Sequence, residues 1–398
     1  MAVKQALAGI KIADFSWIQV APLVTKQFAQ HGATVVKVES STKLDMQRTL
    51  PPMAGGVEGI NRSGSFASPN DNKYGITLNL KHPKGLEIAQ RLIAWSDVVV
   101  ENFMPGTMAQ MGLDYKEMQR IKKNIIMLSM SMFGQTGRYA RKGGFGTQLA
   151  SAVGFTELTG WPDREPITLP TALPDQVAPW YGVCAVLGAL DYRRRTGKGM
   201  YIDISLYETG MTFLSQAVLD CSANGRIWSR AGNRCSYAAP HGVYPCRGND
   251  RWCAIAVFND REWDALCKVM MEPQWTKLDK FATFLGRKEN EDELDRLVGE
   301  WTINYAAEEV MQKCQGAGIA AGVVESNKDL LDDPQLKDRH HFWMLEHPEM
   351  GVTPYDGPSF RLSRTPAEIV RPAPCLGEHN EYVCTHILNM RDEECGGN

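Results

Sequence analysis

Residues 10–40 read IKIADFSWIQVAPLVTKQFAQHGATVVKVES and contain two short β-branched runs, IKIADFS and TVVKVES, with a helical pattern at 21–31 between them. The same order continues along the first 210 residues. Three further strands are predicted, GITLNL (75–80), DVVVENF (97–103) and IIMLSMS (125–131), with helices at 83–95 and 115–122. This alternation predicts an α/β domain, a doubly wound parallel sheet with helices on both faces. Ligands of such sheets bind beyond the carboxyl ends of the strands, here at the loops FSWIQVAP, ENFMPG and SMFGQTGRYARKGGFG.

The pattern changes after residue 225. Residues 241–258, HGVYPCRGNDRWCAIAVF, predict a hairpin around a Gly-Asn-Asp turn, and helical segments follow at about 260–271, 290–302 and 306–316. From AGVVES onward short strands return. A smaller α+β domain is therefore predicted at 226–322, within a chain whose 398 residues favour two domains.

Composition excludes several classes of protein. A net charge of −3 provides no electrostatic footprint for nucleic acid or an anionic membrane, so neither is expected as a partner. No apolar run has the length of a membrane span and the start of the chain lacks the apolar core of a signal peptide, which together predict a cytoplasmic protein. Its ten cysteines form no CxxC pair and are expected to be reduced thiols, and no metal-binding, dinucleotide-binding or P-loop motif is present.

Asp175 stands before a nearly all-apolar run in residues 169–206, LPTALPDQVAPWYGVCAVLGALDYRRRTGKGMYIDISL. Residues 177–192 predict a helix buried in a large domain. An aspartate at such a place usually caps the first turn, and a catalytic carboxylate is the rarer alternative. Pro179 belongs within the first turn, so the N-cap is expected at Gln176 or later, with Asp175 just outside the helix. Both interpretations of Asp175 remain open at this point.

A series of short strings, spread over nearly the whole chain, resembles the class III coenzyme A transferases, the formyl-CoA and carnitine CoA-transferase family. The matching strings are LAGIKIADFSWIQVAP, HGATVVKVES, ITLNLKHPKG, DVVVENFMPG, SMFGQTGRYARK, LPDQVAPWYGVCAVLGALDYRRRTGKG, GIAAGVVES, DDPQLKDRHHF, LSRTP and LGEH. The resemblance implies a Rossmann-like large domain assembled from both chain ends, 1–225 and 323–398, with the smaller domain inserted. It also implies an interlocked dimer, either of identical chains or with a paralogous subunit.

The resemblance implies that Asp175 is a nucleophile. It would attack the thioester of a donor acyl-CoA, such as succinyl-CoA, and pass through a mixed anhydride and an enzyme–CoA thioester before an acceptor carboxylic acid takes the CoA. Coenzyme A thioesters are then substrates, and neither a tightly bound cofactor nor a metal is expected. Oxyanion donors are expected among the backbone N–H groups beside Asp175 or in the 143–146 loop.

Other residues are assigned through the same resemblance. Gln19 matches a glutamine near the thioester, and the CoA contacts would come from Leu78, Asn102, Phe103, Arg138, Arg141 and Lys142. The chain departs from the family pattern in three places, where Gly146 replaces an acidic residue and Gln110 and Ser40 replace arginines.

The substrate pocket is predicted at Trp17, Phe145 and Gly146. Aromatic residues, and the room that a glycine leaves at position 146, suggest a bulky or aromatic acid such as benzylsuccinate. An acyl-CoA racemase of the same fold is the nearest alternative, but it needs a second acid/base group where this chain has Phe145 and Gly146. The remaining alternatives are a supporting subunit of a heteromeric transferase and a plain CoA-binding module.

Overall fold

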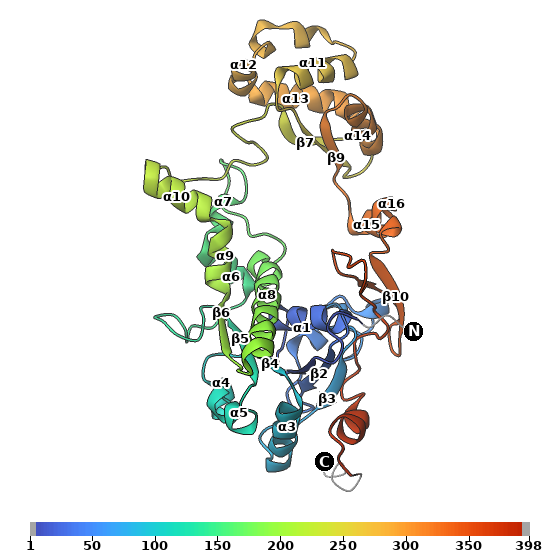
Figure 1. Ribbon diagram of the computed structural model, residues 1–398. Coiled ribbons are helices and arrows are strands. Elements are labelled where there is room, and N and C mark those ends of the chain that lie inside the picture. Colours follow the sequence, from blue (N-terminus) through green and yellow to red (C-terminus); the bar gives the residue numbers. More distant parts are fainter. Residues whose placement is uncertain (1–4, 392–398) are drawn as a thin grey trace. The chain divides into compact units, whose positions relative to one another are not determined.

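The computed structural model describes residues 5–391 and divides into two compact units (Figure 1). The larger unit combines residues up to Thr156 with Thr168–Ile227 and the chain from Pro334 onward, and the smaller unit combines Glu157–Ile167 with Trp228–Asp333. The smaller unit thus extends past the predicted limits 226–322, and those limits stay a prediction. Each unit is described by itself.

The larger unit is built on a six-stranded sheet with the order β3-β2-β1-β4-β5-β6, in which every pair is parallel. This confirms the predicted α/β fold with a doubly wound parallel sheet. The strands are β1 (Lys11–Asp14), β2 (Thr34–Glu39), β3 (Tyr74–Thr77), β4 (Val98–Glu101), β5 (Ile126–Ser131) and β6 (Tyr201–Ser205). The chain order reverses between β1 and β4, so the crevice beyond the carboxyl ends of these two strands is the expected ligand site.

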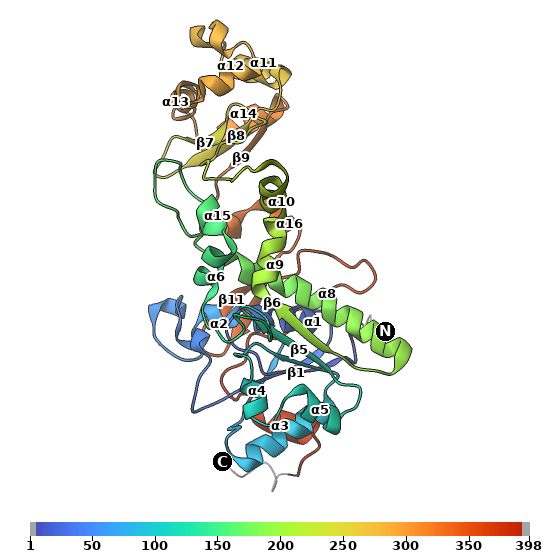
Figure 2. The same ribbon diagram turned by 90° about the vertical axis from the view of Figure 1, so that its left-hand side faces the viewer.

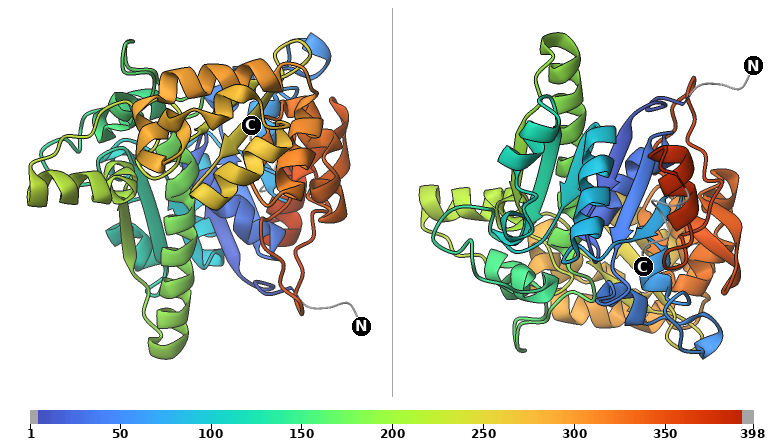
Figure 3. Two further views of the ribbon diagram at one scale, coloured as in Figure 1. Left: turned by 90° about the horizontal axis from the view of Figure 1, so that it is seen from above. Right: turned by 90° about the horizontal axis from the view of Figure 1, so that it is seen from below.

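Helices cover both faces of this sheet because alternate strand residues point to opposite sides (Figures 2 and 3). On one face Ile12 and Val35 pack with α1 (Val20–Gln30) and α8 (Leu173–Thr196). On the other face their neighbours Ala13 and Val36 pack with α3 (Pro83–Trp95) and α5 (Tyr115–Ile121). The loops at the strand ends are thereby held on a rigid two-sided core.

The start of α8 corrects the sequence prediction. The helix begins at Leu173, so Asp175 lies in its first turn and not outside it. Pro174 takes the second helical position, where a missing N–H costs nothing, and Pro179 lies inside the helix. The helix accommodates Pro179 by losing one hydrogen bond, the one that the carbonyl of Asp175 would have accepted.

The expectation of a fully buried α8 is also wrong for this chain. One face is buried, and Gly182 lies so close to the sheet that an added Cβ would meet Val24 at 2.7 Å. The opposite face exposes Trp180, Tyr181 and Leu187, each by more than 40%.

The smaller unit contains an antiparallel sheet with its own hydrophobic core, and its β7–β8 hairpin confirms the predicted one. Its elements are α7 (Phe155–Leu158, shared with the larger unit), β7 (His241–Pro245), β8 (Trp252–Ala256), α11 (Asp260–Val269), α12 (Phe284–Glu289), α13 (Glu291–Thr302), α14 (Ala307–Gly316), β9 (Ala320–Val323) and α15 (Asn327–Asp332). The larger unit also contains α2 (Gly64–Ala67), α4 (Thr107–Gln110), α6 (Gly146–Val153), α9 (Leu206–Phe213), α10 (Ser215–Asn224), α16 (Pro334–Asp338), β10 (Phe342–His347), β11 (Gly351–Asp356), α17 (Asn380–Tyr382) and the short 3₁₀ helix η1 (Met46–Thr49).

Within residues 5–391 no helix is long and apolar enough to cross a membrane, and no group of metal-binding side chains is found. The nine cysteines of this part of the chain form no disulfide bond with one another.

Candidate active site

The loops after β1 and β4 meet at the switch point of the sheet. The side-chain amide of Asn102 binds both backbone groups of Trp17: the Trp17 N–H donates to Asn102 Oδ1 at 2.8 Å, and Asn102 Nδ2 donates to the Trp17 carbonyl at 2.7 Å. The rings of Trp17 and Phe103 stack edge to face with centroids 5.7 Å apart. The structure therefore brings together three of the residues that the sequence had placed on two separate loops.

Asp175 lies at the same edge of the sheet. The helix α8 is the crossover from β5 to β6, so it runs antiparallel to the strands and begins near their carboxyl ends. The Asp175 side chain makes no hydrogen bond or ion pair with any other residue of 5–391, which argues against the capping interpretation. Burial raises the pKa of this carboxyl from 3.8 to about 6. A desolvated carboxylate without a partner is costly to the fold and is typical of a functional group.

Gly146, the first residue of α6, lies directly against Asp175. A Cβ at this position would lie 2.9 Å from Asp175 Cγ and still closer to Asp175 Oδ2 and Ala172 Cβ. The predicted spare room at position 146 is therefore wrong, because the Asp175 carboxylate and Ala172 fill it. Two helix starts, those of α6 and α8, meet at this carboxylate. In α8 Pro174 has no N–H and the Asp175 N–H donates to the Ala172 carbonyl at 2.9 Å, so the first turn of α6 is the better source of N–H donors.

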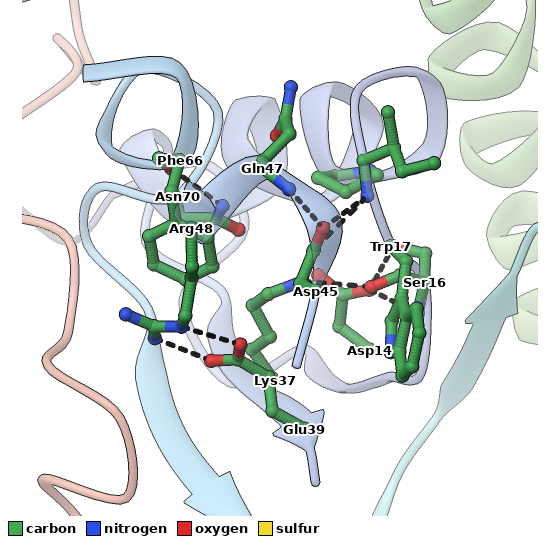
Figure 4. A network of polar contacts seen from close by, with 12 residues as sticks. Asp14, Ser16, Trp17, Lys37, Glu39, Asp45, Gln47, Arg48, Phe66 and Asn70 are labelled. Carbon is green, nitrogen blue, oxygen red and sulfur yellow. Dashed lines mark hydrogen bonds and ion pairs between the residues drawn. The ribbon is translucent and has the colours of Figure 1, made fainter. Parts of the chain in front are cut away.

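Gln19 is the N-cap residue of α1, and its amide meets the amide of Gln47 at 2.6 Å. Two residues that sequence reasoning missed hold this loop, Asp45 and Gln47 (Figure 4). Asp45 is fully buried and accepts hydrogen bonds from the N–H groups of Ile18 and Gln47. The sequence offers one signal for this contact: Asp45 stands two residues before Gln47, and an aspartate in such a position can cap a short helix.

The basic run lies beside the β4 loop. Arg138 and Arg141 line one hollow of about 420 Å³, together with Pro105 and Gly106. These two arginines and Lys142 are exposed and form no ion pair with another residue of 5–391. Leu78 follows β3, two strands away from β1, and its N–H donates to the Glu39 carbonyl at 2.8 Å. Its predicted role toward adenine stays a prediction, as do the individual roles of the other site residues.

Phe145 is 58% exposed and stands immediately before α6, one residue from the contact between Gly146 and Asp175. Its backbone N–H donates to Gln148 Oε1 at 3.0 Å, which fixes the turn that leads into the helix. An exposed ring at this position can contact a molecule bound at Asp175. Neither Phe145 nor Gly146 offers a group that could accept a proton.

Comparison with known proteins identifies relatives along the whole chain. The pattern of CoA-transferase family III matches residues 7–380. The chain is 32% identical to the beta subunit of succinyl-CoA–L-malate CoA-transferase and 30% identical to succinyl-CoA–D-citramalate CoA-transferase, both from Chloroflexus aurantiacus; each match covers 98% of this chain and 95% of the relative. It is 28% identical to human succinyl-CoA:glutarate CoA-transferase over 98% of this chain and 88% of that protein. Among solved structures, a CAIB/BAIF family protein from Brucella suis superposes with a TM-score of 0.89 at 29% identity, over 96% of this chain and all of that one.

Proposed function

This chain belongs to CoA-transferase family III, and from that premise we propose that it moves CoA from succinyl-CoA to a carboxylic acid through a covalent intermediate on Asp175. The family membership confirms the resemblance found in the sequence. The observation that carries the proposal is the Asp175 carboxylate, which has no partner among residues 5–391 and lies between two helix starts at the ligand edge of the sheet.

The proposed reaction converts a thioester, an anhydride and a carboxylic acid into one another and needs no ATP. An Asp175 oxygen attacks the thioester carbonyl of succinyl-CoA, the C–S bond breaks, and a mixed anhydride and the CoA thiolate result. The thiolate attacks the aspartyl carbonyl, releases succinate and leaves an aspartyl–CoA thioester. The acceptor carboxylate then attacks this thioester and expels the thiolate, which attacks the acceptor carbonyl to give the new acyl-CoA and free Asp175.

The surroundings of Asp175 suit these steps. A carboxylate is a weak nucleophile, and desolvation with a raised pKa strengthens it. The first-turn N–H groups of α6 are the proposed donors to each oxyanion, since Pro174 has no N–H and the Asp175 N–H already donates to the Ala172 carbonyl. Trp17, Asn102 and Phe103 are proposed to bind the thioester end of CoA at the switch point, where they contact one another. Gln19, two residues after Trp17, is proposed to lie beside the thioester with them.

The test of this function is to incubate the protein with succinyl-CoA and a panel of acids, and to trap the Asp175 peptide with hydroxylamine or borohydride. An adduct on that peptide together with CoA exchange supports the proposal. Exchange without an adduct, or an adduct on another residue, would contradict it.

The acidic side of the pH profile should report Asp175. Because its pKa is about 6, kcat/KM should be constant near neutral pH and should fall about tenfold per pH unit below 6. The measurement is kcat/KM for succinyl-CoA between about pH 4.5 and 8, and a profile that stays flat down to the ordinary aspartate range near pH 4 would contradict the assignment.

The CoA phosphates are proposed to bind at the hollow of Arg138 and Arg141. Replacing both arginines by glutamine should raise KM for succinyl-CoA about tenfold and leave kcat within about twofold, because the phosphates bind equally in the ground and transition states. Arg120→Gln is the matched control, since Arg120 is an exposed arginine that binds Glu117 on α5. An equal rise in KM for the control would show a general charge effect.

A dicarboxylic acid is the proposed acceptor, since the relatives are named for malate, citramalate and glutarate. The sequence predicts a bulky or aromatic acid such as benzylsuccinate. One reason for that prediction, spare room at Gly146, does not hold, so the prediction depends on Trp17 and the exposed Phe145. The panel should therefore contain malate, citramalate, glutarate, benzylsuccinate and a monocarboxylic acid, and exclusive use of the monocarboxylic acid would overturn this part of the proposal.

A second chain is proposed to cover the exposed apolar face of α8. Trp180, Tyr181 and Leu187 are three large apolar side chains exposed on the same helix, and a second chain would remove them from water. The partner is either another copy, as in the predicted interlocked dimer, or a paralogous subunit, since relatives include alpha and beta subunits of one transferase. Sedimentation and activity of the purified protein decide between a homodimer, a heteromer and a monomer.

A further inference from the structure

We propose that Asp45 is a positioning residue, which holds the Trp17–Gln19 loop in the conformation that CoA transfer requires. The inference rests on the proposed function, because its consequence is the placement of Gln19 at the thioester. Asp45 lies outside the loop it controls, 27 residues from Ile18 in the sequence.

Asp45 is a buried acceptor aimed at the loop. Its side chain has no exposed area, and both carboxylate oxygens accept from the Ile18 N–H, at 3.2 and 3.1 Å. Lys37 Nζ lies 3.5 Å from Asp45 Oδ2 and donates to the Ser16 carbonyl at 2.8 Å. Lys37 thus stabilises the Asp45 charge and binds the other end of the same loop.

The loop needs such a clamp because Ile18 adopts a disfavoured backbone conformation. Its φ is +64°, in the left-handed region that a β-branched residue rarely occupies. Asn102 fixes the backbone of Trp17, and Asp45 fixes the next N–H along the chain. Asn102 and Asp45, which come from different segments, therefore bind the successive N–H groups of Trp17 and Ile18. Strained backbone that is held in this way is typical of functional sites.

The segment that carries Asp45 is itself rigid. Arg48 makes a bidentate ion pair with Glu39 at the end of β2, in which Nε donates to Oε1 at 2.7 Å and Nη2 to Oε2 at 2.6 Å. The guanidinium carbon of Arg48 lies 3.6 Å from the centre of the Phe66 ring. Asp45 also caps η1 through the Gln47 N–H at 3.0 Å. Figure 4 shows Arg48 and its Glu39 partner on one side of Asp45 and Trp17 on the other.

Gln47 connects the segment that carries Asp45 to Gln19. Its amide contacts the Gln19 amide at 2.6 Å, and with the amide turned over its nitrogen can donate to the Ile18 carbonyl instead. In either orientation Gln47 binds the segment Ile18–Gln19. Loss of Asp45 should therefore let Ile18 relax to a negative φ and move Gln19, the N-cap of α1, away from the switch point.

The test compares Asp45→Ala, Asp45→Asn and the double variant Asp45→Ala with Ile18→Gly. Asp45→Ala should lower kcat about 50-fold and change KM for succinyl-CoA by less than about threefold. Asn retains one acceptor oxygen and should lose less activity. Glycine adopts a positive φ without strain, so kcat of the double variant should be about tenfold higher than kcat of Asp45→Ala. Asp114→Ala is the matched control, since Asp114 caps α5 through the Glu117 N–H at 2.9 Å and should leave kcat unchanged.

Two results would overturn the inference. The first is an Asp45→Ala enzyme with wild-type kcat, and the second is a loss of kcat that Ile18→Gly does not relieve. If the wild-type protein transfers no CoA, the proposed function fails, and thermal unfolding then tests the clamp by itself. Ile18→Gly should raise the Tm more in the wild-type protein, where it relieves the positive φ, than in Asp45→Ala, where Ile18 has already relaxed, and equal shifts in both backgrounds would contradict the clamp.

Discussion

Asp175→Asn should abolish CoA transfer, with a fall in kcat of at least about 10⁴-fold, because an amide cannot form the anhydride. The trapped adduct should disappear with the activity. The measurement is CoA exchange between succinyl-CoA and the best acceptor acid, followed by mass analysis of the peptide that contains residue 175. Full exchange by the variant would falsify the nucleophile assignment.

The same substitution should stabilise the fold at neutral pH. Burial raises the pKa of Asp175 from 3.8 to about 6, so the native protein binds this proton more tightly than the unfolded chain does. Ionisation therefore destabilises the native state progressively as the pH rises from about 4 to 6, and the full penalty persists above that range. The expected gain for Asp175→Asn is about 1 kcal/mol near neutral pH, since partial solvent contact screens the shift, and it should vanish near pH 4.

Denaturant unfolding of the wild-type protein and the variant at both pH values checks this expectation. A variant that is inactive and also strongly destabilised at neutral pH would show that Asp175 supports the fold, and the loss of activity would then have an indirect cause.

The sheet of the larger unit could be predicted from the sequence because its strands are buried on both faces. Continuous β-branched runs such as Val98–Val100 are required there, and the runs mark each strand to within a few residues. The parallel direction follows from the helices between the strands. The family resemblance then pointed to Asp175, since its strings surround the residue on both sides.

The start of α8 could not be predicted in the same way. A proline inside a helix usually marks the first turn, and Pro179 was placed there, but Pro174 occupies that position and α8 tolerates Pro179 at the cost of one hydrogen bond. The exposed apolar face of α8 could not be predicted either. An all-apolar helix predicts complete burial, and the sequence does not say whether its own chain or a second one provides the cover.

The Asp45 clamp lay outside sequence reasoning for a physical reason. The positive φ of Ile18 is imposed by side chains on β2, η1 and the β4 loop, and no local pattern at WIQ encodes it. The contact between Gly146 and Asp175 is likewise tertiary. A glycine at position 146 predicts empty space, whereas its lack of a side chain is what allows the two segments to touch.

Gly146→Ala should lower kcat about 100-fold or more, because its methyl group would take the place of the Asp175 carboxylate. The Cβ would lie 2.9 Å from Asp175 Cγ, a separation that real Cβ atoms essentially never show, and Ala172 blocks the other side. The carboxylate must turn away or α6 must shift, and a displacement of about 1 Å at a nucleophile is enough for such a loss. Binding of CoA should change little, so KM for succinyl-CoA should remain within about threefold of the wild-type value.

Gly143→Ala provides the matched control from the same loop. Its Cβ would meet only the Met104 side chain, at 3.7 Å, an ordinary van der Waals contact. Both substitutions replace a glycine by alanine within the same four residues of the chain, but only Gly146→Ala adds a methyl group against Asp175. Equal kcat values for the two variants would mean that the loop contributes flexibility and not the close fit around the nucleophile. A loss confined to Gly146→Ala, with the Asp175 adduct reduced in proportion, would show that a glycine at this position is required because the carboxylate occupies the space of a side chain.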